Sequence, residues 1–181
     1  MTLDPALPRP TNARRFSVIY LDHHACRDHE HILRDLRLVG LKPTDAVVMN
    51  MGGWCYPVLG FKDWASRIDR LAEGIGQLIA HRGPMWIWRS SMVLQEHVFR
   101  TKKNVFNGYL SGGVHFMTDM RRMEFESYAQ DKLSRVGVHI WDVHAISQLG
   151  LNKEQDMIHA SHPTHWAMNK DLLDTFVCPA N

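Results

Sequence analysis

The chain has 181 residues, of which 45% are hydrophobic and 22% are charged, so it can bury a sizeable core as one globular domain. Its net charge of +2 gives no electrostatic reason to expect a nucleic-acid partner, and no apolar run is long enough to span a membrane. The cysteine count of three excludes a dense disulfide framework. One disulfide beside one free thiol stays open as an alternative, among Cys26, Cys55 and Cys178.

Short runs rich in β-branched and aromatic residues predict four strands. A Pro-rich, flexible lead-in over residues 1–14 precedes them, and residues 15–181 are predicted to form a single domain. The predicted strands cover residues 16–21, 46–49, 85–88 and 136–141.

Helical patterns alternate with these strands. Asp28 is expected to cap a helix that runs to Val39 and stops at Gly40, and the strongest pattern opens at Asp63 and ends at Gly83-Pro84. A third helix is predicted over 118–134. The predicted apolar stripes are Trp64, Ile68, Leu71, Ile75 and Leu78 in the second helix, Phe125, Ala129 and Leu133 in the third, and Met168, Leu172, Leu173, Phe176 and Val177 in a terminal helix. The pattern predicts an α/β fold, a mostly parallel sheet with helices on both faces.

Ligands of such sheets bind at the carboxyl ends of the strands. Four polar segments follow the predicted strands, and a further stretch, residues 92–116, is expected to be a long loop beside the site. The four segments are Asp22-His23-His24, Asn50 to Trp54, Arg89 to Ser91, and a predicted loop from Asp142 through His159. We therefore expect the functional site at this edge of the sheet.

Asp156 and His159 are the strongest candidates for catalysis. An acid and a histidine three residues apart can share one side of a turn, where the carboxylate orients the imidazole and the imidazole takes a proton from a nucleophile. A structural hydrogen-bonded pair is the alternative.

Other polar residues after the strands suit substrate binding. Asn50, with Gly52 and Gly53, fits either an oxyanion hole or a simple tight turn. Arg89 either binds an anion or sugar hydroxyl or pairs with a surface carboxylate. Trp54 is placed to stack on a sugar ring, whereas Trp86 and Trp88 are expected in the core.

Four stretches in this order resemble the PC-esterase family, a branch of the SGNH/GDSL-type serine hydrolases that includes the trichome-birefringence-like and the neurexophilin-and-PC-esterase proteins. The stretches are residues 46–54, which end in an Asn, Gly and Trp turn, 85–91, which end in Arg89-Ser90-Ser91, 138–147, and the terminal block from Asp156 through His159 to Leu173. Together they span roughly residues 16–179.

The resemblance implies a three-layer SGNH/flavodoxin-like sandwich and a Ser-His-Asp mechanism with no cofactor. Asp156 would be the orienting acid and His159 the general base, while Asn50, Gly52, Gly53, Trp54 and Arg89 would bind the oxyanion or the substrate. The implied activity is hydrolysis or transfer of acyl esters, with O-acetylated glycans as substrates. The implied location is the secretory pathway or cell surface.

The chain departs from this family at its nucleophile. The family opens with a Gly-Asp-Ser block after its first strand, and no Gly-Asp-Ser occurs in this sequence. Ser90, Ser91 and Ser111 lack a Gly-x-Ser-x-Gly context and are expected to be turn residues. We expect the missing block to lie upstream, because it would also supply a strand that the sheet lacks.

Two other classes of function remain as alternatives. A binding module would keep the fold and an aromatic and arginine-lined cleft for a glycan or protein without the chemistry. A metal-dependent phosphoesterase would use Asp22-His23-His24, a signature of the DHH phosphoesterases, although the lead-in lacks the paired aspartates that such enzymes need. His162 and His165 are expected on the solvated surface and not as metal ligands.

Overall fold

The computed structural model describes residues 29–51, 55, 59–80, 83–93, 118–149 and 162–177. The predicted lead-in, the strand predicted at 16–21 and nearly all of the loop predicted at 92–116 lie outside these residues. The elements in chain order are α1 (His29–Val39), β1 (Ala46–Met49), α3 (Phe61–Ala80), β2 (Met85–Arg89), α5 (Asp119–Arg135), β3 (His139–Trp141), α6 (Val143–Leu149), α7 (His162–Leu172) and the short π-helical segment η2 (Leu173–Val177).

The described strands form one parallel sheet in the order β1-β2-β3. Val47 of β1 lies opposite Trp86 of β2, and Ile87 lies opposite His139 of β3. Parallel neighbours need helical crossovers, and α3 and α5 supply the two that join these strands. The predicted α/β class with a parallel sheet is therefore confirmed.

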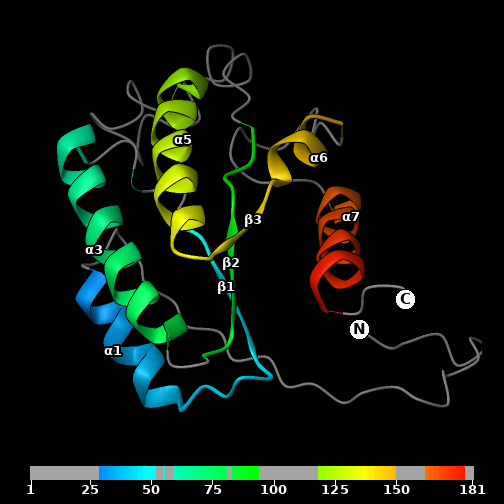
Figure 1. Cartoon of the computed structure of the whole chain (residues 1–181). Coiled ribbons are helices and arrows are strands. Elements are labelled where there is room, and N and C mark those ends of the chain that lie inside the picture. Colours follow the sequence, from blue (N-terminus) through cyan, green and yellow to red (C-terminus); the bar gives the residue numbers. More distant parts are fainter. Residues whose placement is uncertain are drawn as a thin grey trace, which may run out of the picture.

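Successive residues of β2 point to opposite faces of the sheet. Because its apolar side chains lie on both faces, helices cover both faces. Trp86 and Trp88 are buried in the core that α1, α3 and α5 form with the sheet. Ile87, between them, is buried against Trp141 and Met168 in a second cluster. Figure 1 shows the same division, with α1, α3 and α5 on one side of the strands and α6 and α7 on the other.

Helix α3 confirms the predicted apolar stripe. Trp64, Ile68 and Ile75 are fully buried, and Leu71 is nearly so. The helix begins at Phe61 and not at Asp63, because the amide of Trp64 already donates to the carbonyl of Gly60 at 3.0 Å. None of the described helices has the length and apolar character that crossing a membrane requires.

Two glycines determine where α1 ends and how closely α1 packs against α3. Gly40 has a φ of 68°, a left-handed conformation that stops α1 where the sequence predicted. Gly74 lets α1 approach α3, since an added Cβ would lie 2.3 Å from Cδ1 of Leu33. The Leu33 side chain therefore packs directly against α3 at Gly74.

The predicted strand at 136–141 is too long by three residues. The Val136 amide donates to Leu133 O and caps α5, and Gly137 follows with a φ of 90°. The backbone at Gly137 departs from the extended conformation, and pairing with β2 begins only at His139.

The loop predicted from Asp142 onward is partly wrong, because residues 143–149 form helix α6. Oδ1 of Asp142 accepts the amide of His144 at 3.0 Å and so caps the helix. The terminal helix α7 starts at His162 and buries Met168, but Leu173 and Val177 are each 38% exposed, so its apolar face is narrower than predicted.

Gly74 and Gly76 provide a matched test of this packing. We expect Gly76→Ala to raise the free energy of unfolding by up to about 1 kcal/mol, because alanine has the higher helix propensity and its Cβ would meet Val136 at an ordinary 3.5 Å. Gly74→Ala should lose this gain or reverse it, since Leu33 must move. Urea denaturation measures both, and equal gains would contradict the close α1–α3 contact.

Candidate functional site

The carboxyl ends of the three described strands are joined by hydrogen bonds. Nδ2 of Asn50, after β1, donates to the carbonyl of Arg89 at 2.6 Å. The amide of Ser90, after β2, donates to the carbonyl of Trp141 at 2.9 Å. These contacts bring together two predicted substrate-binding residues, Asn50 and Arg89, at one edge of the sheet.

Ser90 connects β2 to the start of α6. Its Oγ donates to Oδ1 of Asp142 and accepts from the amide of Val143, both at 2.9 Å. Ser90 is 1% exposed and the adjacent Ser91 is 6% exposed. The Ser90 hydroxyl therefore has a structural role, since it both donates and accepts a hydrogen bond within the fold. This role agrees with the expectation that Ser90 is a turn residue.

A buried carboxylate, Glu126 of α5, organises the end of β2. Its Oε2 accepts from Nε1 of Trp88, and its Oε1 accepts from the amide of Ser91, each at 3.0 Å. Glu126 is 2% exposed, so both bonds are made away from solvent. The charge is stabilised by two donors that the strand and its turn would otherwise leave unpaired.

The Arg89 guanidinium lies half-buried at the same edge. Its Nη2 contacts Sδ of Met168 on α7 at 3.8 Å, and among the described residues it has no carboxylate partner within ion-pair distance. Burial lowers the pKa of Arg89 from its ordinary value, while the negative charge of Glu126 opposes this shift. A guanidinium remains protonated near neutral pH, so this side chain presents a desolvated positive charge.

A second polar cluster joins α5 to α6 beside Ser91. Nε of Arg122 pairs with Oδ1 of Asp119 at 2.7 Å, and Nη1 of Arg122 reaches the carbonyl of Ser91 at 3.5 Å. Nε2 of His144 lies 3.9 Å from Oδ2 of Asp119, beyond hydrogen-bond distance. Burial, followed by the charge of Arg122, lowers the pKa of His144, so its imidazole is neutral at pH 7.

The sequence prediction missed Glu126, Arg122 and Asp119, although a signal existed. Arg122 and Glu126 are four residues apart and lie on the same buried face of α5 as the stripe of Phe125, Ala129 and Leu133. Charged residues at buried stripe positions indicate buried polar contacts.

Several predicted site residues lie outside the described part of the chain. They are the proposed acid–base pair Asp156 and His159, the turn residues Gly52, Gly53 and Trp54, the alternative metal-binding stretch Asp22-His23-His24, and Ser111.

The described residues hold no group of three or more histidines, cysteines or carboxylates arranged to bind a metal. His162 and His165 lie exposed in the first turn of α7, where the sequence placed them on the surface.

The comparisons with known proteins find no match, either to a protein-family model or to a curated protein.

Glu126 gives a direct test of the network at the end of β2. We expect Glu126→Leu to lower the free energy of unfolding by roughly 2–5 kcal/mol, because it leaves the Trp88 indole and the Ser91 amide without an acceptor. Glu126→Gln keeps one acceptor oxygen and should cost less. Urea denaturation measures both, beside Glu124→Gln, an exposed control on the same helix that should change stability by less than about 0.5 kcal/mol. A Glu126→Leu protein as stable as the wild type would contradict the assigned role.

His144 predicts a pH dependence of stability. Its pKa in the folded protein is lowered from 6.5, so the unfolded chain binds the proton more readily. Stability should therefore fall as the pH drops from about 7 through the unfolded pKa and toward the lower folded pKa.

His144→Gln removes the titrating group and should flatten this part of the profile. Thermal unfolding between pH 5 and about pH 8 measures the effect, with exposed His162→Gln as the control. The prediction fails if His144→Gln and wild type lose stability in parallel. The facing charges of Arg122, Asp119, Asp142 and Glu126 stay the same in both proteins.

Proposed function

We propose that this chain is an SGNH-type domain of the PC-esterase kind that acts on acyl esters, with O-acetylated glycans as its substrates. The observation that carries the proposal is the contact between the Asn50 side chain and the Arg89 main chain at the carboxyl ends of adjacent parallel strands. Both residues belong to stretches that resemble the family, and their contact lies at the carboxyl ends of parallel strands, the edge where open α/β sheets bind ligands.

The position of α7 supports the same arrangement. Asp156 and His159 precede α7 closely in the sequence, since His159 is three residues before its first residue, His162. One turn and a half into α7, Met168 contacts the Arg89 guanidinium. The covalent connection thus ties the proposed acid–base pair to the helix that packs on the proposed substrate-binding arginine.

Each residue has a defined role in the proposed reaction. A serine hydroxyl attacks the acyl carbonyl while His159 takes its proton, and Asp156 holds the imidazole in register. The His159 proton then passes to the leaving sugar oxygen, and water or a sugar hydroxyl releases the acyl group from the serine. The bond from the Asn50 amide to Arg89 O would hold Asn50 at the strand ends, beside the developing oxyanion.

The nucleophile is not evident in this chain. Ser90 and Ser91 are buried, and the Ser90 hydroxyl is bonded to Asp142 and Val143, so neither is poised for attack. This observation favours a second candidate, an inactive SGNH-like module that binds a glycan or protein through the same edge.

A disulfide bond supports the expected location of the protein in the secretory pathway or at the cell surface. Cys55 is disulfide-bonded, and the other cysteines of the sequence, Cys26 and Cys178, lie outside the described residues. Disulfides persist mainly in oxidising compartments, so the bond favours the secretory pathway or cell surface.

Fluorophosphonate labelling tests the proposed chemistry. With the Gly-Asp-Ser block that we expect upstream present, one serine should be labelled and identified by mass spectrometry, and acetate should be released from acetylated xylo-oligosaccharides. His159→Ala should lower both rates by about 10³-fold or more, and Asn50→Ala should lower turnover by about 10²-fold through loss of an oxyanion donor. His162→Ala, exposed on α7, is the matched control and should retain activity.

The alternative outcomes separate the two candidates. Absence of labelling and of acetate release from the folded protein would overturn the hydrolase for this chain. Calorimetric binding of the acetylated oligosaccharide by that same inactive protein would then support the binding module.

A further inference from the structure

The disulfide of Cys55 has its second cysteine outside the described residues, and the fold restricts which cysteine this is. The sequence offers two candidates, Cys26 and Cys178. The Cα atoms of a disulfide lie about 4.4–6.8 Å apart, so the partner must come from a segment that leads close to Cys55. The nearest described residue to Cys26 is His29, the first of α1, and the nearest to Cys178 is Val177, the last of η2.

Cys55 lies at the carboxyl edge of the sheet, on the face that α1, α3 and α5 cover. Its carbonyl accepts the amide of Leu59 at 2.9 Å, and the Leu59 carbonyl accepts Nη2 of Arg121, in the first turn of α5, at 2.6 Å. Both α3 and α5 begin at this edge, because each follows a strand that ends there. Cys55 is 3% exposed and packs in the core cluster of these helices.

The segment that leads to Cys178 lies on the other face and at the other edge of the sheet. Phe176 packs with the second core cluster, on the side of the strands where Figure 1 shows α7. Its ring centroid lies 6.1 Å from that of His139, the first residue of β3, so Phe176 is at the amino edge. Cys178 follows Phe176 by two residues, which span at most about 7 Å. This reach carries Cys178 neither across the sheet nor along the strands to Cys55.

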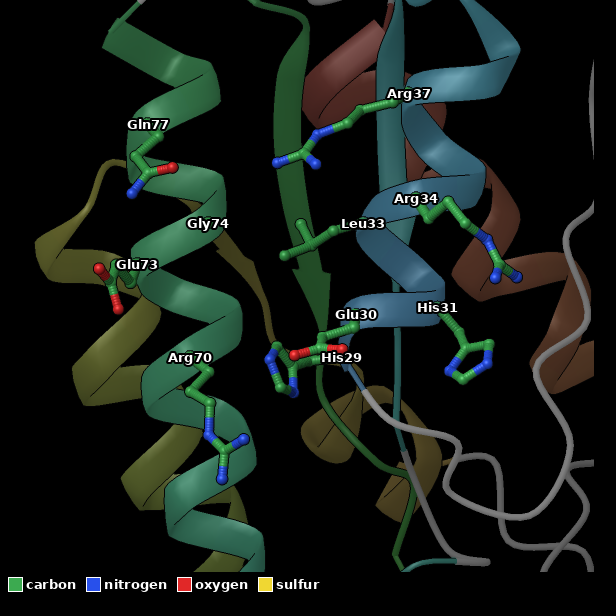
Figure 2. Close-up of a pocket in the computed structure, with 10 residues that line it drawn as sticks. All are labelled: His29, Glu30, His31, Leu33, Arg34, Arg37, Arg70, Glu73, Gly74 and Gln77. Carbon is green, nitrogen blue, oxygen red and sulfur yellow. The ribbon is translucent and has the colours of Figure 1, made fainter.

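The start of α1 leads toward Cys55. Figure 2 shows α1 and α3 running in the same direction, with His29 level with Arg70. The first residue of α3, Phe61, lies about 13 Å further toward the carboxyl edge, at 1.5 Å per helical residue. Cys26 precedes His29 by three residues, which extend about 10 Å, and the disulfide bridges several ångströms more. This length of chain is enough to bring Cys26 to Cys55.

We infer that Cys55 pairs with Cys26, which leaves Cys178 as a free thiol. The bond closes a loop from residue 26 to residue 55 that contains α1 and β1, and it ties the start of α1 to the carboxyl edge of the sheet. Its formation joins two sulfurs and releases two protons and two electrons, which a disulfide donor of an oxidising compartment takes up. The burial of Cys55 shields the bond from small reductants.

The bond also holds the segment that follows β1. Asn50 is fixed at one end of this segment by its hydrogen bond to Arg89, and Cys55 is fixed at the other end by the disulfide. Gly52 and Gly53, which are proposed to bind the oxyanion, lie between them in the sequence. This consequence for the site rests on the proposed function, whereas the pairing of the cysteines does not.

Peptide mapping without reduction tests the pairing in protein produced through a secretory pathway. The protein is unfolded with an alkylating reagent present and is then digested with trypsin, which places the cysteines on separate peptides, residues 16–27, 38–62 and 171–181. We expect the first two peptides to be joined by a bond that dithiothreitol breaks, and the third to be alkylated. Any other pairing, or an alkylated Cys55 before reduction, would overturn the inference. The mapping requires no activity, so its result is independent of the fluorophosphonate experiment.

Serine variants measure what the bond contributes, and Cys178→Ser serves as both the background and the control, since it should unfold like the wild type. In this background, Cys26→Ser and Cys55→Ser should each raise the equilibrium constant for unfolding by about 10²-fold or more, because the unfolded chain regains the freedom of the open loop. The variant that lacks both cysteines should lose no more than either single variant, since each breaks the same bond. Urea denaturation measures all of them. Additive losses would overturn the pairing, and peptide mapping of the wild type decides it where a variant fails to fold.

Discussion

The buried carboxylate of Glu126 is the constraint on which the described edge of the sheet depends. It binds an indole inside β2, that of Trp88, and the first turn beyond the strand at Ser91. These donors come from one segment and the acceptor from α5, more than thirty residues later. Burying a carboxylate is costly unless it is fully bonded, so α5 can occupy only the position that delivers both oxygens to these donors. That position also places Arg122 and Asp119 at the edge.

Asp142 performs a comparable task on the neighbouring strand. Its Oδ1 receives the hydroxyl of Ser90 and the amide of His144. One carboxylate thereby connects the turn after β2 to the helix that follows β3. Because the Ser90 hydroxyl also accepts the amide of Val143, its two hydrogen bonds fix the two turns relative to each other. A site assembled from adjacent strand ends needs this rigidity, since loosely held groups lose their orientation toward a substrate.

Sequence patterns predicted the parts of this fold that depend on local periodicity. The limits of β1 and the buried stripe of α3 follow from runs of Val, Ile and Trp with clear spacing, and Gly40 stops α1 by its own backbone freedom. Helix α6 has only seven residues, too few for a helical period to show, and it depends on the Asp142 cap. The buried roles of Glu126 and Arg122 depend on partners distant in sequence. The proximity of Asn50 and Arg89 was predictable, because parallel strands place their carboxyl ends together. The hydrogen bond between the two residues was not predictable.

The fold keeps the positive charge of Arg89 partly out of water. Arg89 is half-buried beside Met168, and its desolvation lowers its pKa. Such desolvated groups cluster at functional sites, where an anion or developing negative charge restores the lost solvation. A charge pair in such a less polar setting is stronger and less screened by salt than a pair at the exposed surface.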